Sequence, residues 1–137
     1  MPSDPTPKLS GRVLLVEDGP DNQRLISHHL ERAGAQVTIA PNGKLGVEAA
    51  LASKAEGKPF DLIVMDMQMP ELDGYAATEQ LRQSGWKGPI LALTAHALTG
   101  DRERCLAAGC DDYACKPIDR TLLLELCAAL LGKPSGR

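Results

Sequence analysis

The chain alternates between short apolar runs and longer amphipathic stretches, and this alternation predicts its secondary structure. Five runs predict strands, within 12–17, 36–40, 62–65, 89–93 and 112–115. The run 62–65 is apolar at four consecutive positions, which is typical of a parallel strand buried on both faces. A stretch long enough for a helix follows each run, so strands and helices alternate along the chain.

Capping and breaking residues mark the limits of the predicted helices. Asn42, Asp73 and Asp119 each precede a helical pattern and are expected to act as N-caps. The breaker Gly19-Pro20 precedes the first helix, and a weaker helical pattern covers roughly 99–108. Four glycines are expected to end helices: Gly34, Gly85, Gly109 and Gly132.

Strict alternation of five strand–helix pairs predicts one α/β domain, a (βα)5 unit with a parallel sheet and helices on both faces. We expect this domain to cover 11–132. Residues 1–10 contain three prolines among polar residues and are predicted to be a disordered lead-in or linker, and 133–137 a tail.

Composition narrows the classes of function. The 137 residues are 43% hydrophobic and 24% charged, as in an ordinary soluble domain, and the net charge of −3 argues against a nucleic-acid-binding surface. No apolar run approaches the roughly 20 residues of a membrane span, and no signal peptide is visible at the N-terminus. The four cysteines lack metal-site spacing, so we expect buried free thiols in a cytoplasmic protein.

Polar residues that follow the predicted strands suggest one shared site. Asp66 follows 62–65, and Glu17 and Asp18 end the first strand. In a flavodoxin-like strand order, 2-1-3-4-5, the first and third strands are neighbours, so these acids converge at the carboxyl edge of the sheet. Thr94 and Lys116 end the fourth and fifth strands at the same edge.

These residue types together describe a site for a metal ion and a phosphoryl group. Three crowded carboxylates repel one another unless a cation joins them, and oxygen ligands favour Mg²⁺, with Mn²⁺ as an alternative. Lys116 would add a counter-charge and Thr94 a hydrogen bond, so that Asp66 could attack phosphorus and form an aspartyl phosphate. No glycine-rich phosphate loop is present, so a bound nucleotide is not implied.

Five motifs in order resemble the receiver domain of two-component response regulators, over about 11–132. They are Val13–Asp18, Val64–Pro70, Leu72–Gly74, Ala92–Ala95, and Asp112–Tyr113 with Lys116–Pro117. The flavodoxin-like strand order rests partly on this resemblance. The residues of these motifs are similar to those in receiver domains of hybrid sensor histidine kinases, especially at Asn22-Gln23, 66–70 and 92–97. Gly19 differs from that pattern, because a polar residue is common at its position.

The resemblance implies a role for each site residue. Asp66 matches the phosphoacceptor, and Asp18 and Asp66 match direct Mg²⁺ ligands. The backbone carbonyl of Gln68 matches a third ligand, and Glu17 matches one acting through water.

The phosphoryl side of the site is implied in the same way. Thr94, the Ala95 amide and Lys116 match the groups that hold the phosphoryl oxygens. Thr94 also matches the switch hydroxyl, and Tyr113 the aromatic residue that turns inward with it.

The function implied is acceptance of a phosphoryl group from a histidine kinase or phosphotransfer protein, followed by slow autodephosphorylation rather than enzymatic turnover. Helix four, strand five and helix five would form the responsive surface and a potential homodimer contact. The parent protein is expected to be a hybrid sensor histidine kinase, and a stand-alone regulator is the alternative.

Two other classes of function are weaker alternatives. A phosphatase with an aspartyl-phosphate intermediate needs a second carboxylate two residues after the nucleophile, where Gln68 stands. A docking module independent of phosphorylation would not need the acids and Lys116. His28-His29 and His96 are interpreted as helix-surface and loop residues.

Overall fold

The computed structural model describes residues 8–69, 72–95 and 101–132. Its strands are β1 (Arg12–Val16), β2 (Gln36–Ala40), β3 (Leu62–Asp66), β4 (Ile90–Thr94) and β5 (Asp112–Cys115). Its helices are α1 (Pro20–Arg32), α2 (Gly43–Ala55), α3 (Gly74–Gln83), α4 (Asp101–Ala108) and α5 (Arg120–Leu131). The strands form one parallel sheet in the order β2-β1-β3-β4-β5, which confirms the predicted fold.

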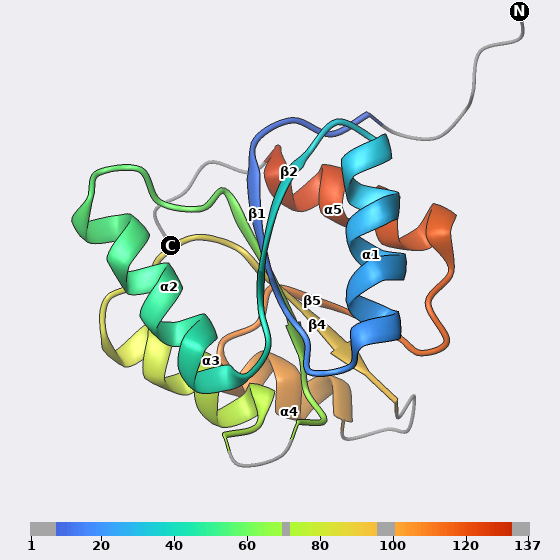
Figure 1. Ribbon diagram of the computed structural model, residues 1–137. Coiled ribbons are helices and arrows are strands. Elements are labelled where there is room, and N and C mark those ends of the chain that lie inside the picture. The colour runs from blue at the N-terminus through green and yellow to red at the C-terminus, as the bar shows by residue number, and fades with distance from the viewer. Residues whose placement is uncertain (1–7, 70–71, 96–100, 133–137) are drawn as a thin grey trace, which may run out of the picture.

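Helices cover both faces of the sheet, as Figure 1 shows. The α1 and α5 helices lie on one face, and α2, α3 and α4 lie on the other. Leu14 of β1 and Ile63 of β3 point into the core under α2 and α3, while Val13 and Leu62 point into the core under α1 and α5. Every position of a central strand thus meets an apolar layer, which explains the uninterrupted apolar runs.

The predicted helix caps are confirmed. The side chains of Asn42 and Asp73 each accept a hydrogen bond at 2.8 Å from the backbone N–H three residues later, and Asp119 accepts one from Thr121 N at 3.3 Å. The α1 helix starts at Pro20 without a side-chain cap. Such caps satisfy backbone donors that the first turn leaves unpaired.

Some boundaries differ from prediction by one residue. The first strand stops at Val16, before Glu17, and β3 includes Asp66. The β4 strand begins after Pro89, because proline has no N–H for the ladder, although the Pro89 carbonyl still accepts from Ile63 N at 3.1 Å.

The ends of the chain are described in part. Most of the predicted lead-in and the whole predicted tail, like Pro70, Thr99 and His96, lie outside the described residues. Leu9 is buried, and its N–H donates to Ala33 O at 2.7 Å.

Among the described helices, none has the length and apolar character needed to cross a membrane. Cys105, Cys110 and Cys127 are buried free thiols, as predicted, and Cys115 is half-buried.

Gly74 allows α3 to approach the end of β3 closely. A Cβ atom at this position would lie 2.3 Å from Asp66 O and 2.8 Å from Met67 Cα. Both are backbone atoms, which cannot rotate away, so a side chain here would push α3 from the strand end that carries Asp66.

We therefore expect Gly74→Ala to lower the free energy of unfolding by about 1–3 kcal/mol, the usual cost of overpacking. Gly132→Ala is the control, because its Cβ would meet Ala128 O at an ordinary 3.4 Å, and it should change stability by less than about 0.5 kcal/mol. Urea denaturation of both variants tests this. Equal stabilities of the two variants would contradict it.

Candidate functional site

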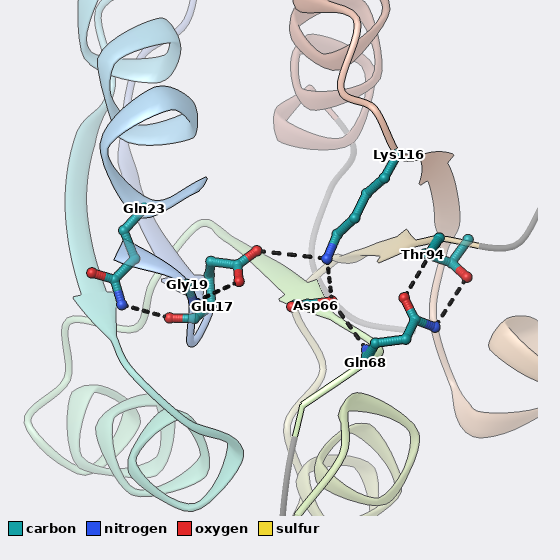
Figure 2. Close-up of polar contacts among 8 residues, drawn as sticks. Glu17, Gly19, Gln23, Asp66, Gln68, Thr94 and Lys116 are labelled. Atoms are coloured by element: carbon teal, nitrogen blue, oxygen red, sulfur yellow. Dashed lines mark hydrogen bonds and ion pairs between the residues drawn. The ribbon is translucent and has the colours of Figure 1, made fainter. Parts of the chain in front are cut away.

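The carboxyl ends of four strands bring the predicted site residues to one edge of the sheet. Figure 2 shows Asp66 at the end of β3, with Glu17, Thr94 and Lys116 around it. The register pairs Val16 with Met65 and Thr94 with Cys115, so the residue after each partner also lies at this edge. The predicted convergence is thus present.

Asp66 is a buried carboxylate whose two oxygens differ in their hydrogen-bond partners. Its side chain is 1% exposed. Lys116 Nζ lies 2.9 Å from Oδ1, and Gln68 N donates to the same oxygen at 3.0 Å. The other oxygen, Oδ2, is buried and has no hydrogen-bond partner among the described residues. A buried carboxylate oxygen without a partner costs free energy, so this atom is poised for a ligand.

Glu17 is equally buried and is held by the start of α1. Its Oε2 accepts from Gly19 N at 2.9 Å, and Gln23 Nε2 donates to its backbone carbonyl at 2.7 Å. Its Oε1 lies 3.9 Å from Lys116 Nζ, too far for a hydrogen bond, and has no other partner within the described part of the chain. Sequence reasoning did not assign Gln23 this anchoring contact.

The pKa of Glu17 is raised from 4.5 to about 7, chiefly by burial and also by the negative charge of Asp66, while the Gly19 N–H and the Lys116 ammonium oppose the shift. A single ammonium therefore leaves two adjacent buried carboxyl groups incompletely neutralised.

Glu17, Asp18 and Asp66 can hold a cation together. One carboxylate oxygen from each lies within 4.8 Å of the others, and Asp18 is exposed while its two neighbours are buried. An all-oxygen set in which two buried oxygens have no hydrogen-bond partner within 8–69, 72–95 and 101–132 fits a hard divalent ion. The carboxylates predicted as metal ligands are thus brought together.

Thr94 and Ala95 lie on the other side of Asp66 and contact an unexpected partner. Gln68 Nε2 donates to Thr94 Oγ1 at 3.3 Å, and Ala95 N donates to Gln68 Oε1 at 2.7 Å. The family resemblance implied only a backbone role for Gln68, and the contacts of its side chain were not predicted. The available signal was a polar residue two positions after Asp66, in a loop beside a strand that ends in Thr94.

The structure also locates Tyr113 and the histidine pair on α1, and their predicted roles stay predictions. Tyr113 is half-buried on β5 and packs against the core under α2, α3 and α4. His28 is exposed and His29 half-buried on α1, with ring centres 6.0 Å apart.

Glu17→Gln should change the dependence of stability on pH. A carboxyl with a raised pKa stabilises the folded state fully below pH 4.5, and this contribution is lost as the pH rises through about 7. In EDTA, the free energy of unfolding of the wild type should therefore fall by up to about 3 kcal/mol relative to Glu17→Gln between pH 4.5 and 8. Urea titrations across this range measure it.

Excess Mg²⁺ should shrink this difference, because a metal site favours the deprotonated carboxylate. Glu48→Gln, on an exposed position of α2, is the control and should follow the wild type. Parallel pH profiles of the wild type and Glu17→Gln would contradict the prediction.

Comparison with known proteins agrees with this geometry. The family model for the response regulator receiver domain matches residues 13–128. A magnesium-bound crystal structure of the receiver domain of sensor histidine kinase PA1611 from Pseudomonas aeruginosa PAO1 is 42% identical, with a TM-score of 0.79 over 91% of this chain and all of that one. The Vibrio cholerae chemotaxis protein CheY4 is 27% identical, with a TM-score of 0.76 over 89% of this chain and 99% of that one.

Curated relatives are much longer than this chain. Sensor histidine kinase GacS of Pseudomonas protegens is 41% identical over 90% of this chain and 14% of its own length. Hybrid signal transduction histidine kinase I of Dictyostelium discoideum is 43% identical over 84% of this chain and 7% of its own length. The chain thus spans a small part of these relatives. With the parallel sheet, the acids at its carboxyl edge and these matches in agreement, the chain belongs to the response regulator receiver domain family.

Proposed function

We propose that Asp66 accepts a phosphoryl group from the phosphohistidine of a histidine kinase or phosphotransfer protein, with a divalent ion bound beside it. The observation that carries this is the environment of Asp66: a buried carboxylate with Lys116 on one oxygen and the other oxygen unpartnered among the described residues, next to Glu17. A carboxylate serving only stability would have both oxygens satisfied.

Mg²⁺, or Mn²⁺ in its place, is the proposed cofactor. Asp18, Asp66 and the backbone carbonyl of Gln68 would hold it, with Glu17 acting through water. When bound, the ion offsets the negative charge of the carboxylates and of the phosphoryl oxygens. The magnesium-bound receiver domain from Pseudomonas aeruginosa supports this assignment.

In the transfer step, an Asp66 oxygen attacks phosphorus. The O–P bond forms as the P–N bond to the donor imidazole breaks, and the electron pair of that bond stays on the nitrogen. The Lys116 ammonium, the Thr94 hydroxyl and the Ala95 amide would bind the phosphoryl oxygens. Three observations support these roles: Lys116 Nζ contacts Asp66, Thr94 lies on the β4 side of Asp66 (Figure 2), and Ala95 N donates to the Gln68 side chain there.

Release of the phosphoryl group is a slow hydrolysis. Water attacks phosphorus, the bond to Asp66 breaks, and carboxylate and inorganic phosphate result. The residue two positions after Asp66 is Gln68, whose amide cannot remove a proton from that water. We therefore propose a signalling module with autodephosphorylation and not a phosphatase with rapid turnover.

Phosphorylation is proposed to act on the surface formed by α4, β5 and α5. A phosphoryl group would attract Thr94, and Tyr113 would turn inward with it. This surface is also the proposed homodimer contact. Leu106 on α4 and Leu122 on α5 are 43% and 44% exposed, which supports a contact role.

The parent protein is proposed to be a cytoplasmic-facing hybrid sensor histidine kinase, in which 11–132 is the receiver domain. The kinase relatives, of which the chain covers 7% and 14%, support this over a stand-alone regulator.

Asp66→Asn should abolish phosphorylation, since an amide is not a nucleophile toward phosphorus. Acetyl phosphate with Mg²⁺, followed by intact-mass measurement, should give a phosphorylated wild type and an unmodified variant. Asp21→Asn changes an exposed carboxylate on α1 and should be modified like the wild type. A modified Asp66→Asn protein would overturn the assignment.

Lys116→Met should separate metal binding from phosphoryl binding. Loss of the ammonium leaves Asp66 buried beside Glu17, so we expect the metal-free protein to lose about 3 kcal/mol of stability and Mg²⁺ to bind at least as tightly. Beryllofluoride, a phosphoryl mimic, should bind at least about tenfold more weakly, because a charge-assisted contact is lost.

NMR titration measures both affinities, with the exposed Lys44→Met on α2 as the control. Unchanged beryllofluoride affinity in Lys116→Met would remove Lys116 from the phosphoryl site.

A further inference from the structure

The side chain of Gln68 contacts both groups that the proposed function assigns to the phosphoryl oxygens on the β4 side. Its Nε2 donates to Thr94 Oγ1 at 3.3 Å, and its Oε1 accepts from Ala95 N at 2.7 Å. Figure 2 shows the amide of Gln68 turned toward the end of β4, away from Asp66. One side chain thus joins the β3 end to the β4 end.

Backbone contacts hold the end of β4 between its two neighbours. Met67 N donates to Leu93 O at 2.8 Å from the β3 side, and Lys116 N donates to Thr94 O at 2.7 Å from the β5 side. These ladder contacts hold the strands in register and do not engage the Thr94 hydroxyl or the Ala95 N–H. The Gln68 side chain reaches these two groups, 26 and 27 residues along the chain.

This contact competes with a phosphoryl group. A backbone N–H has one hydrogen, so Ala95 cannot donate fully to a phosphoryl oxygen while it donates to Gln68. Thr94 Oγ1 accepts a hydrogen bond from the Gln68 amide, which ties the hydroxyl to Gln68 without using its hydrogen. Contacts to a charged phosphoryl oxygen are stronger than contacts to a neutral amide, so the exchange is favourable but reduces the gain from phosphorylation.

We propose that the Gln68 side chain is an internal stand-in for the phosphoryl group: a latch that accepts the hydrogen bond of the Ala95 amide, donates one to the Thr94 hydroxyl oxygen, and is displaced on phosphorylation. This rests on the proposed function of Asp66 and adds a positioning residue to it. The latch lowers the affinity of the site for phosphoryl groups, because only molecules with the latch open have the Ala95 N–H available to a phosphoryl oxygen.

The chemistry of glutamine suits this role, and its isostere offers a clean test. The amide supplies a donor and an acceptor at one end, as the two contacts require. Methionine has nearly the same length and volume but can make neither contact well. Gln68→Met leaves the backbone N–H to Asp66 and the backbone carbonyl in place, so the proposed metal ligands remain.

The first measurement needs no phosphoryl donor. Hydrogen exchange of the Ala95 amide, followed by NMR, should be at least fivefold faster in Gln68→Met and Gln68→Ala than in the wild type. Gln83→Met, at an exposed position on α3, should exchange like the wild type at Ala95. Equal rates in all four proteins would overturn the latch.

The second measurement is a titration with beryllofluoride in saturating Mg²⁺. Gln68→Met should bind about fivefold more tightly than the wild type, whereas Gln83→Met should bind like the wild type. Equal or weaker binding by Gln68→Met overturns the latch and leaves the function of Asp66 standing. If the wild type and both Gln68 variants fail to bind beryllofluoride, the proposed function fails, and the latch with it.

Discussion

The structure of the site depends on one electrostatic arrangement: two buried carboxyl groups share the ammonium of Lys116. Asp66 and Glu17 are each 1% exposed, and Lys116 Nζ lies 2.9 Å from the first and 3.9 Å from the second. Burial and, to a lesser extent, the negative charge of Asp66 raise the pKa of Glu17 to about 7, because the single ammonium of Lys116 offsets these effects only in part. The carboxyl edge of the sheet therefore favours the binding of a further cation.

The sheet makes this arrangement possible because it is rigid and parallel. Backbone pairing of β1, β3, β4 and β5 places their carboxyl ends side by side, and helices on both faces keep water from the strands that carry the acids. Gly74 lets α3 start directly beside Asp66, and Asp73 caps that helix. The fold thus tolerates an electrostatically unfavourable edge, since the apolar core on both faces stabilises the rest.

The two sides of the site differ in how well their polar groups are satisfied. On the acidic side, Glu17 Oε1 and Asp66 Oδ2 have no hydrogen-bond partner among the residues described. On the other side, the neutral amide of Gln68 pairs with Thr94 and Ala95. A bound cation would therefore stabilise the acidic side most. On the β4 side, a phosphoryl group would have to replace the contacts of Gln68 that are already formed.

Local patterns were enough to predict most of the fold. Apolar runs gave the strands, and Asn42, Asp73 and Asp119 gave three helix starts, because capping and burial periodicity act over a few neighbouring residues. The strand order needed the family resemblance as well, since alternation alone leaves several orders open. The β4 start was one residue off, because Pro89 continues the apolar run but cannot donate to the ladder.

The sequence by itself also determined which residue types stand at the strand ends, and so the chemistry of the site. Only the tertiary structure decided that Glu17 is buried with Asp66, which of their oxygens lack a partner among the described residues, and that the Gln68 amide contacts β4. These properties depend on distances between residues 26 to 50 positions apart. Side-chain rotamers and strand register set those distances, and a local sequence pattern predicts neither of them.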